Sequence, residues 1–178
     1  NYRAFNPDVM PCITHFTDSC SNFTSHLSSS NGTRGSIFGL FFSLSSIYWS
    51  DFELSGIQPL LIEELLAQNY RIGIYPSATL VSPPFAKILF SKVPNLRTHT
   101  PGETVYDRDC CITTDYLQAL DTLGSGTQPF FSFLFYDLAH GIELSKDKLY
   151  RFKPTWEFAD YMKLDNNIDP TPFLNLYY

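Results

Sequence analysis

The stretch Phe130-Phe131-Ser132-Phe133-Leu134-Phe135 is an almost unbroken run of apolar residues. A strand of this composition is typical of a parallel sheet, in which both faces are covered. A second apolar segment, 70–75, follows directly after Asn69, which ends a helix expected over 59–68. A helix that passes within one residue into a strand is typical of an α/β layer. We therefore predict an α/β fold with a mostly parallel sheet flanked by helices.

The remaining elements follow from apolar spacing and from the positions of proline and glycine. Further helices are expected at four places: 10–23, 33–44, 83–90 and 107–123. A short extended piece is expected at 23–27, a turn at 124–126, and irregular connections at 45–58 and 91–106. The last part, 142–178, is predicted to be an irregular, partly exposed excursion that ends in the start of a helix at 173–178.

The length and charge of the chain limit its class. Its 178 residues fit one domain, and a net charge of −6 without any Lys/Arg cluster argues against a nucleic-acid surface. The longest apolar run, 37–42, is too short to span a membrane. Because the chain begins at Asn1 and ends at Tyr178, we interpret 1–178 as one partial domain, incomplete at both ends.

The cysteines, Cys12, Cys20, Cys110 and Cys111, lack the two-residue gap of a zinc knuckle. Cys12 and Cys20 in one helix would stand roughly 12 Å apart, too far for a disulfide. The adjacent Cys110 and Cys111 could bridge only with strain. A bridge between the two pairs stays open, and buried free thiols are the favoured prediction.

The segment Asn31-Gly32-Thr33-Arg34 stands between three serines and the apolar run 37–42, where a loop is expected to become a buried helix. The free N–H groups and the dipole at a helix start favour a phosphate- or sulfate-like anion. Thr33 could then act as nucleophile or metal ligand, and Arg34 could hold an ester oxygen bidentately. The structural alternative is that Asn31 or Thr33 caps the helix.

Asp137 and His140 follow the strand at 130–135. Ligands of open α/β sheets bind beyond the carboxyl ends of the strands, so both residues stand where a site is expected. The alternative is that Asp137 caps a turn and His140 is an ordinary loop histidine.

Several short motifs also follow one another in a recognisable order. They are Asn6-Pro7-Asp8-Val9-Met10-Pro11, Phe23-Thr24-Ser25-His26, Ser30-Asn31-Gly32-Thr33-Arg34, Phe38-Gly39-Leu40-Phe41, Tyr48-Trp49 and Phe133-Leu134-Phe135-Tyr136-Asp137-Leu138-Ala139-His140-Gly141. This order resembles the sulfatase-like periplasmic domain of the YejM (PbgA) inner-membrane proteins and covers most of the chain. More broadly it resembles the alkaline-phosphatase/sulfatase superfamily, whose members share a parallel-sheet α/β fold, a metal site and a nucleophile at a helix start.

The resemblance implies roles for three residues: Thr33 as nucleophile and metal ligand, Arg34 as the neighbouring arginine, and His140 as a histidine that faces the substrate. It also implies a divalent metal (Mg, Mn or Zn) in the full-length domain. The family's acidic ligand on the first strand and its later Asp-His pair are expected outside this chain, so the fragment is expected to bind metal weakly or not at all.

The chain also departs from true sulfatases. Thr33-Arg34-Gly35 lacks their Cys/Ser-x-Pro-x-Arg motif, and Pro76-Ser77 stand where a lysine and a histidine usually follow the strand. These departures argue against sulfate-ester hydrolysis and leave a strict arylsulfatase as the least favoured function.

Two functions remain. The resemblance implies a regulatory or lipid-binding domain on the periplasmic face of the inner membrane, anchored by five upstream membrane helices. Its role would lie in lipopolysaccharide and outer-membrane lipid homeostasis, with lipopolysaccharide or cardiolipin head groups as partners. The alternative is a metal-dependent phosphatase, or a phosphoglycerol- or phosphoethanolamine-type transferase, that uses Thr33 as nucleophile. Both functions require Thr33 to lie accessible at the helix start, beside the strand exit that carries His140.

Overall fold

The structure is a computed structural model that describes residues 9–21, 23, 25–123, 126–140, 152–165 and 167–177. Its sheet consists of β1 (Arg71–Pro76) and β2 (Phe130–Phe135), paired in parallel with Arg71 opposite Phe130 and Pro76 opposite Phe135. The predicted mixture of helices with a parallel sheet is therefore confirmed. The larger sheet of an alkaline-phosphatase-like fold stays a prediction.

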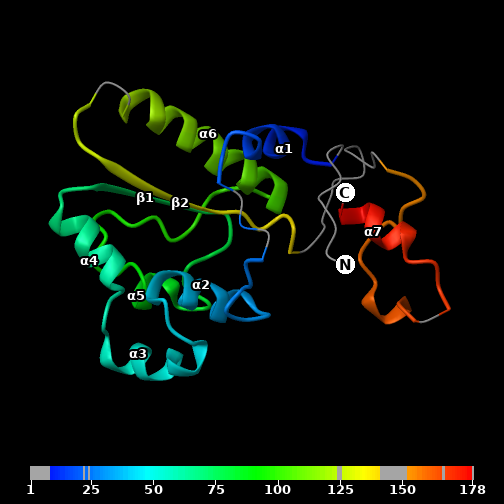
Figure 1. The fold of residues 1–178 in the computed structure, drawn as a ribbon, viewed down its shortest axis with the longest axis horizontal. Helices are drawn as coiled ribbons and strands as arrows, with labels where there is room; N and C mark the ends of the chain where they lie inside the picture. Colours follow the sequence, from blue (N-terminus) through cyan, green and yellow to red (C-terminus); the bar gives the residue numbers. More distant parts are fainter. Residues whose placement is uncertain are drawn as a thin grey trace.

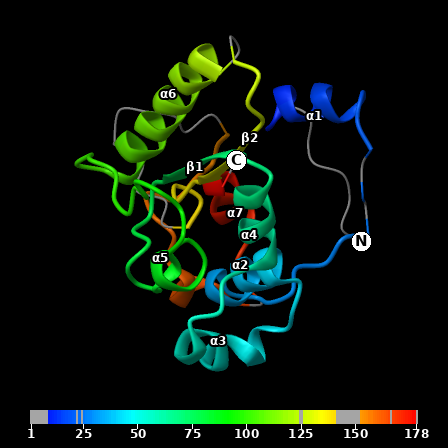
Figure 2. The same ribbon diagram turned by 90° about the vertical axis from the view of Figure 1, so that its left-hand side faces the viewer.

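Helices lie on both faces of this small sheet (Figure 1). The long helix α6 (Val105–Leu123) crosses one face, and α2 (Thr33–Phe42), α4 (Leu60–Ala67) and α5 (Phe85–Ile88) lie on the other. Figure 2 shows the same order of layers from the side, with α3 (Trp49–Ser55) beyond α2 and away from the sheet.

The core lies between α2 and the sheet and is rich in phenylalanine. The ring of Phe41 meets those of Phe90 and Phe133 edge-on, with 5.1 Å between ring centroids in each pair. Such contacts add to the hydrophobic free energy gained by burying the rings. Phe133 and Phe135 of β2 both pack on this core. Alternate residues of β2 therefore anchor the strand to the helices on one face.

β2 is less buried than its composition predicts. Its residues are half-buried, and Phe130 is 41% exposed, so the expectation of burial on both faces is wrong for this structure. Within the described residues β2 pairs with β1 alone. In the part of the chain that the structure describes, one edge of β2 therefore has no neighbouring strand.

Two predicted segments need correction. In place of the helix expected at 10–23, the structure has only the short helix α1 (Pro11–Thr17). Ile13 and Phe16 are 54% and 67% exposed, so the apolar side of α1 is not packed. Most of the stability of a helix comes from such packing, which explains why the helix is short. The irregular segment expected at 45–58 contains a 3-10 turn, η1 (Ser46–Tyr48), followed by α3. Trp49 and Phe52, one helical turn apart, both pack on Phe38 and so hold α3 against the core.

The other helices agree with the sequence within a few residues. Those expected at 33–44, 59–68, 83–90 and 107–123 are α2, α4, α5 and α6. Near the end of the chain, a 3-10 turn, η2 (Tyr161–Lys163), precedes α7 (Thr171–Tyr177), where Trp156 and Phe173 pack with ring centroids 5.6 Å apart. The expected features at 6–8, 24, 124–125 and 141–151 lie outside the described residues.

All four cysteines are free thiols, as predicted, but the prediction that they are buried is wrong. Cys12, Cys20 and Cys110 are exposed and Cys111 is half-buried. In the part of the chain that the structure describes, no helix combines the length and the apolar composition that a membrane crossing requires.

Candidate functional site

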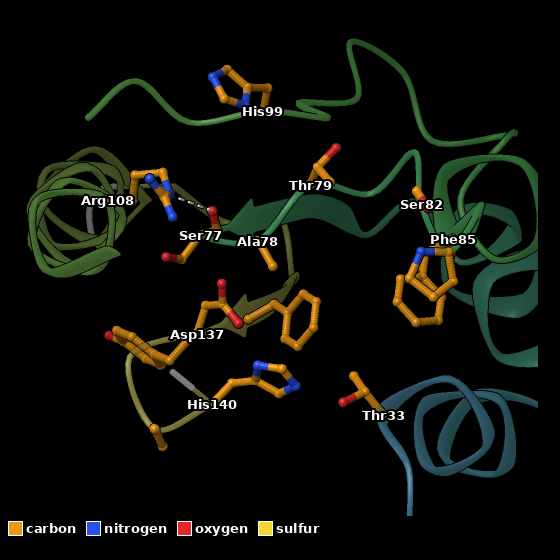
Figure 3. A pocket seen from close by; sticks show the side chains of 14 residues that line it. Thr33, Ser77, Ala78, Thr79, Ser82, Phe85, His99, Arg108, Asp137 and His140 are labelled. Carbon is orange, nitrogen blue, oxygen red and sulfur yellow. Dashed lines mark hydrogen bonds between the residues drawn. The ribbon is translucent and has the colours of Figure 1, made fainter. Parts of the chain in front are cut away.

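A cavity of about 710 Å³ opens at the carboxyl ends of β1 and β2 (Figure 3). We call it the cleft. Its walls include residues that follow each strand, 77–79 after β1 and 136, 137, 139 and 140 after β2, together with Thr33 at the start of α2, Arg108 in α6 and His99. A cleft at this edge of a parallel sheet is where α/β proteins bind ligands. Its volume is in the range of small-molecule sites.

Thr33 and His140 both line the cleft, and both are exposed. Figure 3 shows them facing one another from α2 and from the segment after β2. Both functions predicted from the sequence require this arrangement, in which a threonine is accessible at a helix start, beside a strand exit that carries a histidine. The structure brings the two residues together, and their catalytic roles stay predictions.

The capping alternative for this helix is not observed. The N-cap of α2 is Gly32, in an extended conformation with φ −133°, and the helix has no side-chain cap hydrogen bond. The side chains of Asn31 and Thr33 therefore do not cap the helix. The hydroxyl of Thr33 stays in the wall of the cleft.

A serine-rich segment, 28–30, fixes the position of Thr33 by packing along α2. The hydroxyl of Ser36 donates to the carbonyl of Ser30 over 2.8 Å, and that of Ser29 donates to the carbonyl of Gly35 over 3.3 Å. A Cβ atom on Gly35 would lie 2.6 Å from the Ser30 Oγ and 2.7 Å from its Cβ. The glycine is therefore what lets the segment approach the helix.

Arg34 does not line the cleft. It lies in a neighbouring hollow of about 330 Å³, which Thr33 also lines, and its guanidinium carbon is 5.4 Å from the centroid of the Trp49 ring. This distance is typical of a cation–π contact. The role predicted for Arg34, which is to hold an ester oxygen of a ligand bound at Thr33, stays a prediction. The arginine that lines the cleft is Arg108.

The segment that carries His140 is held by α6. The buried carboxylate of Asp109 accepts hydrogen bonds from the main-chain N–H groups of Asp137 (3.1 Å) and Leu138 (3.0 Å). The N–H of His140 then donates to the carbonyl of Asp137 over 2.9 Å and closes the turn. Asp109 therefore positions the segment, while the side chains of Asp137 and His140 face the cleft.

The residues at the other end of the cleft were not predicted from the sequence. Arg108 donates from Nε to the carbonyl of Ser77 over 3.1 Å, and Ser77 is buried at the end of β1. The hydroxyl of Thr100 binds the carbonyl of Pro76 and so fixes the same strand end. Ligands of α/β sheets bind beyond the carboxyl ends of the strands. This rule applies to β1 as well as to β2, so it could have pointed to the residues that follow β1.

The described residues do not fit the divalent metal that the resemblance implies. Among them, no three His, Cys, Asp or Glu side chains gather closely enough to hold a metal ion. Structural and catalytic zinc sites take three or four such ligands. Metal ligation by Thr33 therefore stays a prediction for a longer protein.

Comparison with known proteins shows that part of this chain is homologous to an inner membrane protein. No family model matches the chain. It is 32% identical over 106 residues to the inner membrane protein YejM of Salmonella typhimurium and of Salmonella typhi, a match that covers 58% of this chain and 18% of each relative. A Haemophilus influenzae protein named only as uncharacterized is 28% identical over 140 residues, 78% of this chain and 22% of its own.

The chain thus spans about a fifth of the length of these curated relatives. The homology confirms the resemblance to YejM proteins over the matched region. Membership of the sulfatase superfamily is a finer statement and stays a prediction.

Proposed function

We propose that this chain is part of the periplasmic region of an inner-membrane protein and that its cleft binds the phosphate-bearing head group of a lipid or lipopolysaccharide. Its role is regulatory, in the homeostasis of outer-membrane lipids. The observation that carries the proposal is the cleft itself, because Thr33, His99, Arg108 and His140 all line this one cavity at the strand ends. Hydroxyl, imidazole and guanidinium groups are donors that suit phosphate oxygens.

The homologues support the location. YejM of Salmonella is named an inner membrane protein, and the region matched here includes more than half of this chain. A phosphate-bearing head group is a ligand that a membrane-anchored domain meets at high local concentration.

Binding is favoured over turnover because a threonine alcohol is a weak nucleophile that needs an adjacent base or a metal to activate it. The described residues that line the cleft supply donors that suit an anion. The second candidate, a phosphatase or phosphoglycerol- or phosphoethanolamine-type transferase, is favoured by one observation. Thr33 and His140 face each other across the same cleft, as a nucleophile and a proton-transfer group would.

The deciding experiment uses the full-length protein in detergent, as wild type and as Thr33→Ala. Hydrolysis of p-nitrophenyl phosphate is measured with Mg²⁺, Mn²⁺ or Zn²⁺, alongside binding of a short-chain phosphatidylglycerol. We expect no turnover that depends on Thr33, and lipid binding that survives the substitution. Thr114→Ala, at an exposed threonine of α6, is the matched control. Metal-dependent turnover that Thr33→Ala abolishes and Thr114→Ala preserves would establish the transferase or phosphatase instead.

A further inference from the structure

Ser77 has an unusual environment at one end of the cleft. The residue is 1% exposed, and its hydroxyl is buried without a hydrogen-bond partner among the residues that the structure describes. Buried polar groups almost always have a partner, since leaving one unpaired costs free energy. Ser77 is also one of the residues that line the cleft, so its unpaired hydroxyl belongs to the wall of that cavity.

Arg108 brings a positive charge to the same end. Its Nε donates to the carbonyl of Ser77 over 3.1 Å, and its Nη1 approaches the carbonyl of Gly102 at 3.5 Å. These bonds fix the guanidinium beside Ser77, with further N–H donors left for a ligand. Figure 3 shows Arg108 and Ser77 side by side, at the opposite end of the cleft from Thr33.

We propose that the Ser77 hydroxyl and the Arg108 guanidinium form the anion pocket of the cleft, which holds a phosphate-type oxyanion. The inference rests on the proposed function and deepens it, because it assigns the charged part of the head group to these two residues. Arg108 then takes the role that the sequence analysis gave to Arg34, whose side chain lies over Trp49 in the neighbouring hollow.

Asp137 limits where the anion can lie. Its carboxylate lines the cleft and appears in Figure 3 between Ser77 and His140. A carboxylate repels a phosphate but accepts hydrogen bonds from hydroxyl groups. A ligand with its phosphate at Arg108 and a glycerol or sugar hydroxyl at Asp137 satisfies both residues.

Ser77→Ala is the decisive substitution, because it removes the unpaired hydroxyl and nothing that holds the fold. In the full-length protein, its melting temperature should equal or exceed that of the wild type. Its affinity for inorganic phosphate and for dihexanoyl phosphatidylglycerol, measured by isothermal titration calorimetry, should fall on the order of ten-fold. Ser55→Ala, at an exposed serine of α3, is the matched control and should bind as the wild type.

Arg108→Gln gives an independent arm, with Arg71→Gln at the opposite end of β1 as its control. Phosphate binding should be lost in Arg108→Gln and kept in Arg71→Gln. Tighter binding of the lipid than of free phosphate identifies a head group as the ligand. Equal affinities would support the pocket but count against a lipid ligand.

The outcomes separate the two proposals. If the wild type binds phosphate and Ser77→Ala and Arg108→Gln bind equally well, the Ser77–Arg108 pocket is wrong while the proposed function stands. Loss of binding in Arg34→Gln alone would return the role to Arg34. A wild type that binds neither phosphate nor the lipid would overturn the proposed function together with the pocket.

Discussion

Asp109 and Asp137 are joined by a hydrogen bond of 3.1 Å, in which the main-chain N–H of Asp137 donates to the buried carboxylate of Asp109. The same carboxylate accepts a second bond from Leu138. One side chain of α6 therefore links the helix on one face of the sheet to the segment that brings His140 to the cleft. The next residue along the helix toward its start, Arg108, lines that cleft itself.

Asp109→Ala should release this segment. The substitution leaves two main-chain N–H groups without their acceptor, at a cost of about 1–3 kcal/mol. We expect faster amide hydrogen exchange at 137–140 and weaker phosphate binding. Asp121→Ala, at an exposed position of the same helix, is the control and should leave exchange at 137–140 unchanged. Unchanged exchange in Asp109→Ala would show that something else holds the segment.

Gly35→Ala should destabilise the start of α2. Alanine is favoured over glycine inside a helix by about 1 kcal/mol, but here its Cβ would lie 2.7 Å from the Cβ of Ser30. The clash is with a short side chain on a packed segment, so we expect the melting temperature to fall. At Gly32, the N-cap of α2, the same change meets no atom within 4 Å, so Gly32→Ala should lose only the better capping preference of glycine and should destabilise less than Gly35→Ala. Equal effects of the two substitutions would contradict the packing described for 28–30.

Phe41→Ala should be strongly destabilising, because the Phe41 ring joins α2 to both Phe90 and β2. Removing a buried phenylalanine ring typically costs about 3–5 kcal/mol. Leu40→Ala, at the neighbouring residue, which is 63% exposed, should change stability little. Thermal denaturation of the full-length protein measures the difference. A small effect of Phe41→Ala would show that the core does not depend on this ring.

Gln58→Ala should loosen the connection between α4 and α5. The buried amide of Gln58 donates to the carbonyls of Lys87 and Ile88 over 3.2 and 3.3 Å and accepts from the N–H of Ser91 over 3.2 Å. Loss of these bonds should cost roughly 2 kcal/mol or more and speed amide exchange at Ser91. Gln68→Ala, at an exposed residue, is the control. Protection of Ser91 that survives Gln58→Ala would contradict this role.

The parallel strand pair could be predicted from the sequence because its signals are local. Apolar runs of strand length, one of them directly after the helix stop at Asn69, located β1 and β2 within one residue. The helix α3 was not predicted, because it is held by the packing of Trp49 and Phe52 on Phe38. This contact is between segments that are separate in the sequence, so the local sequence does not show it.

The candidate site was predicted in part for a similar reason. Thr33 and His140 each follow a local rule, one for helix starts and one for strand ends, and the structure places both in the cleft. The directions of Arg34 and Arg108 depend on tertiary contacts, with the Trp49 ring and with the carbonyl of Ser77, so the sequence could not distinguish them.

Crystals of the full-length protein soaked in tungstate, a tetrahedral oxyanion with a strong anomalous signal, test the central claim most directly. The account predicts an anomalous peak inside the cleft, within hydrogen-bonding distance of the Ser77 hydroxyl and the Arg108 guanidinium. A peak only in the hollow beside Arg34 and Trp49, or no peak in the cleft, would contradict it.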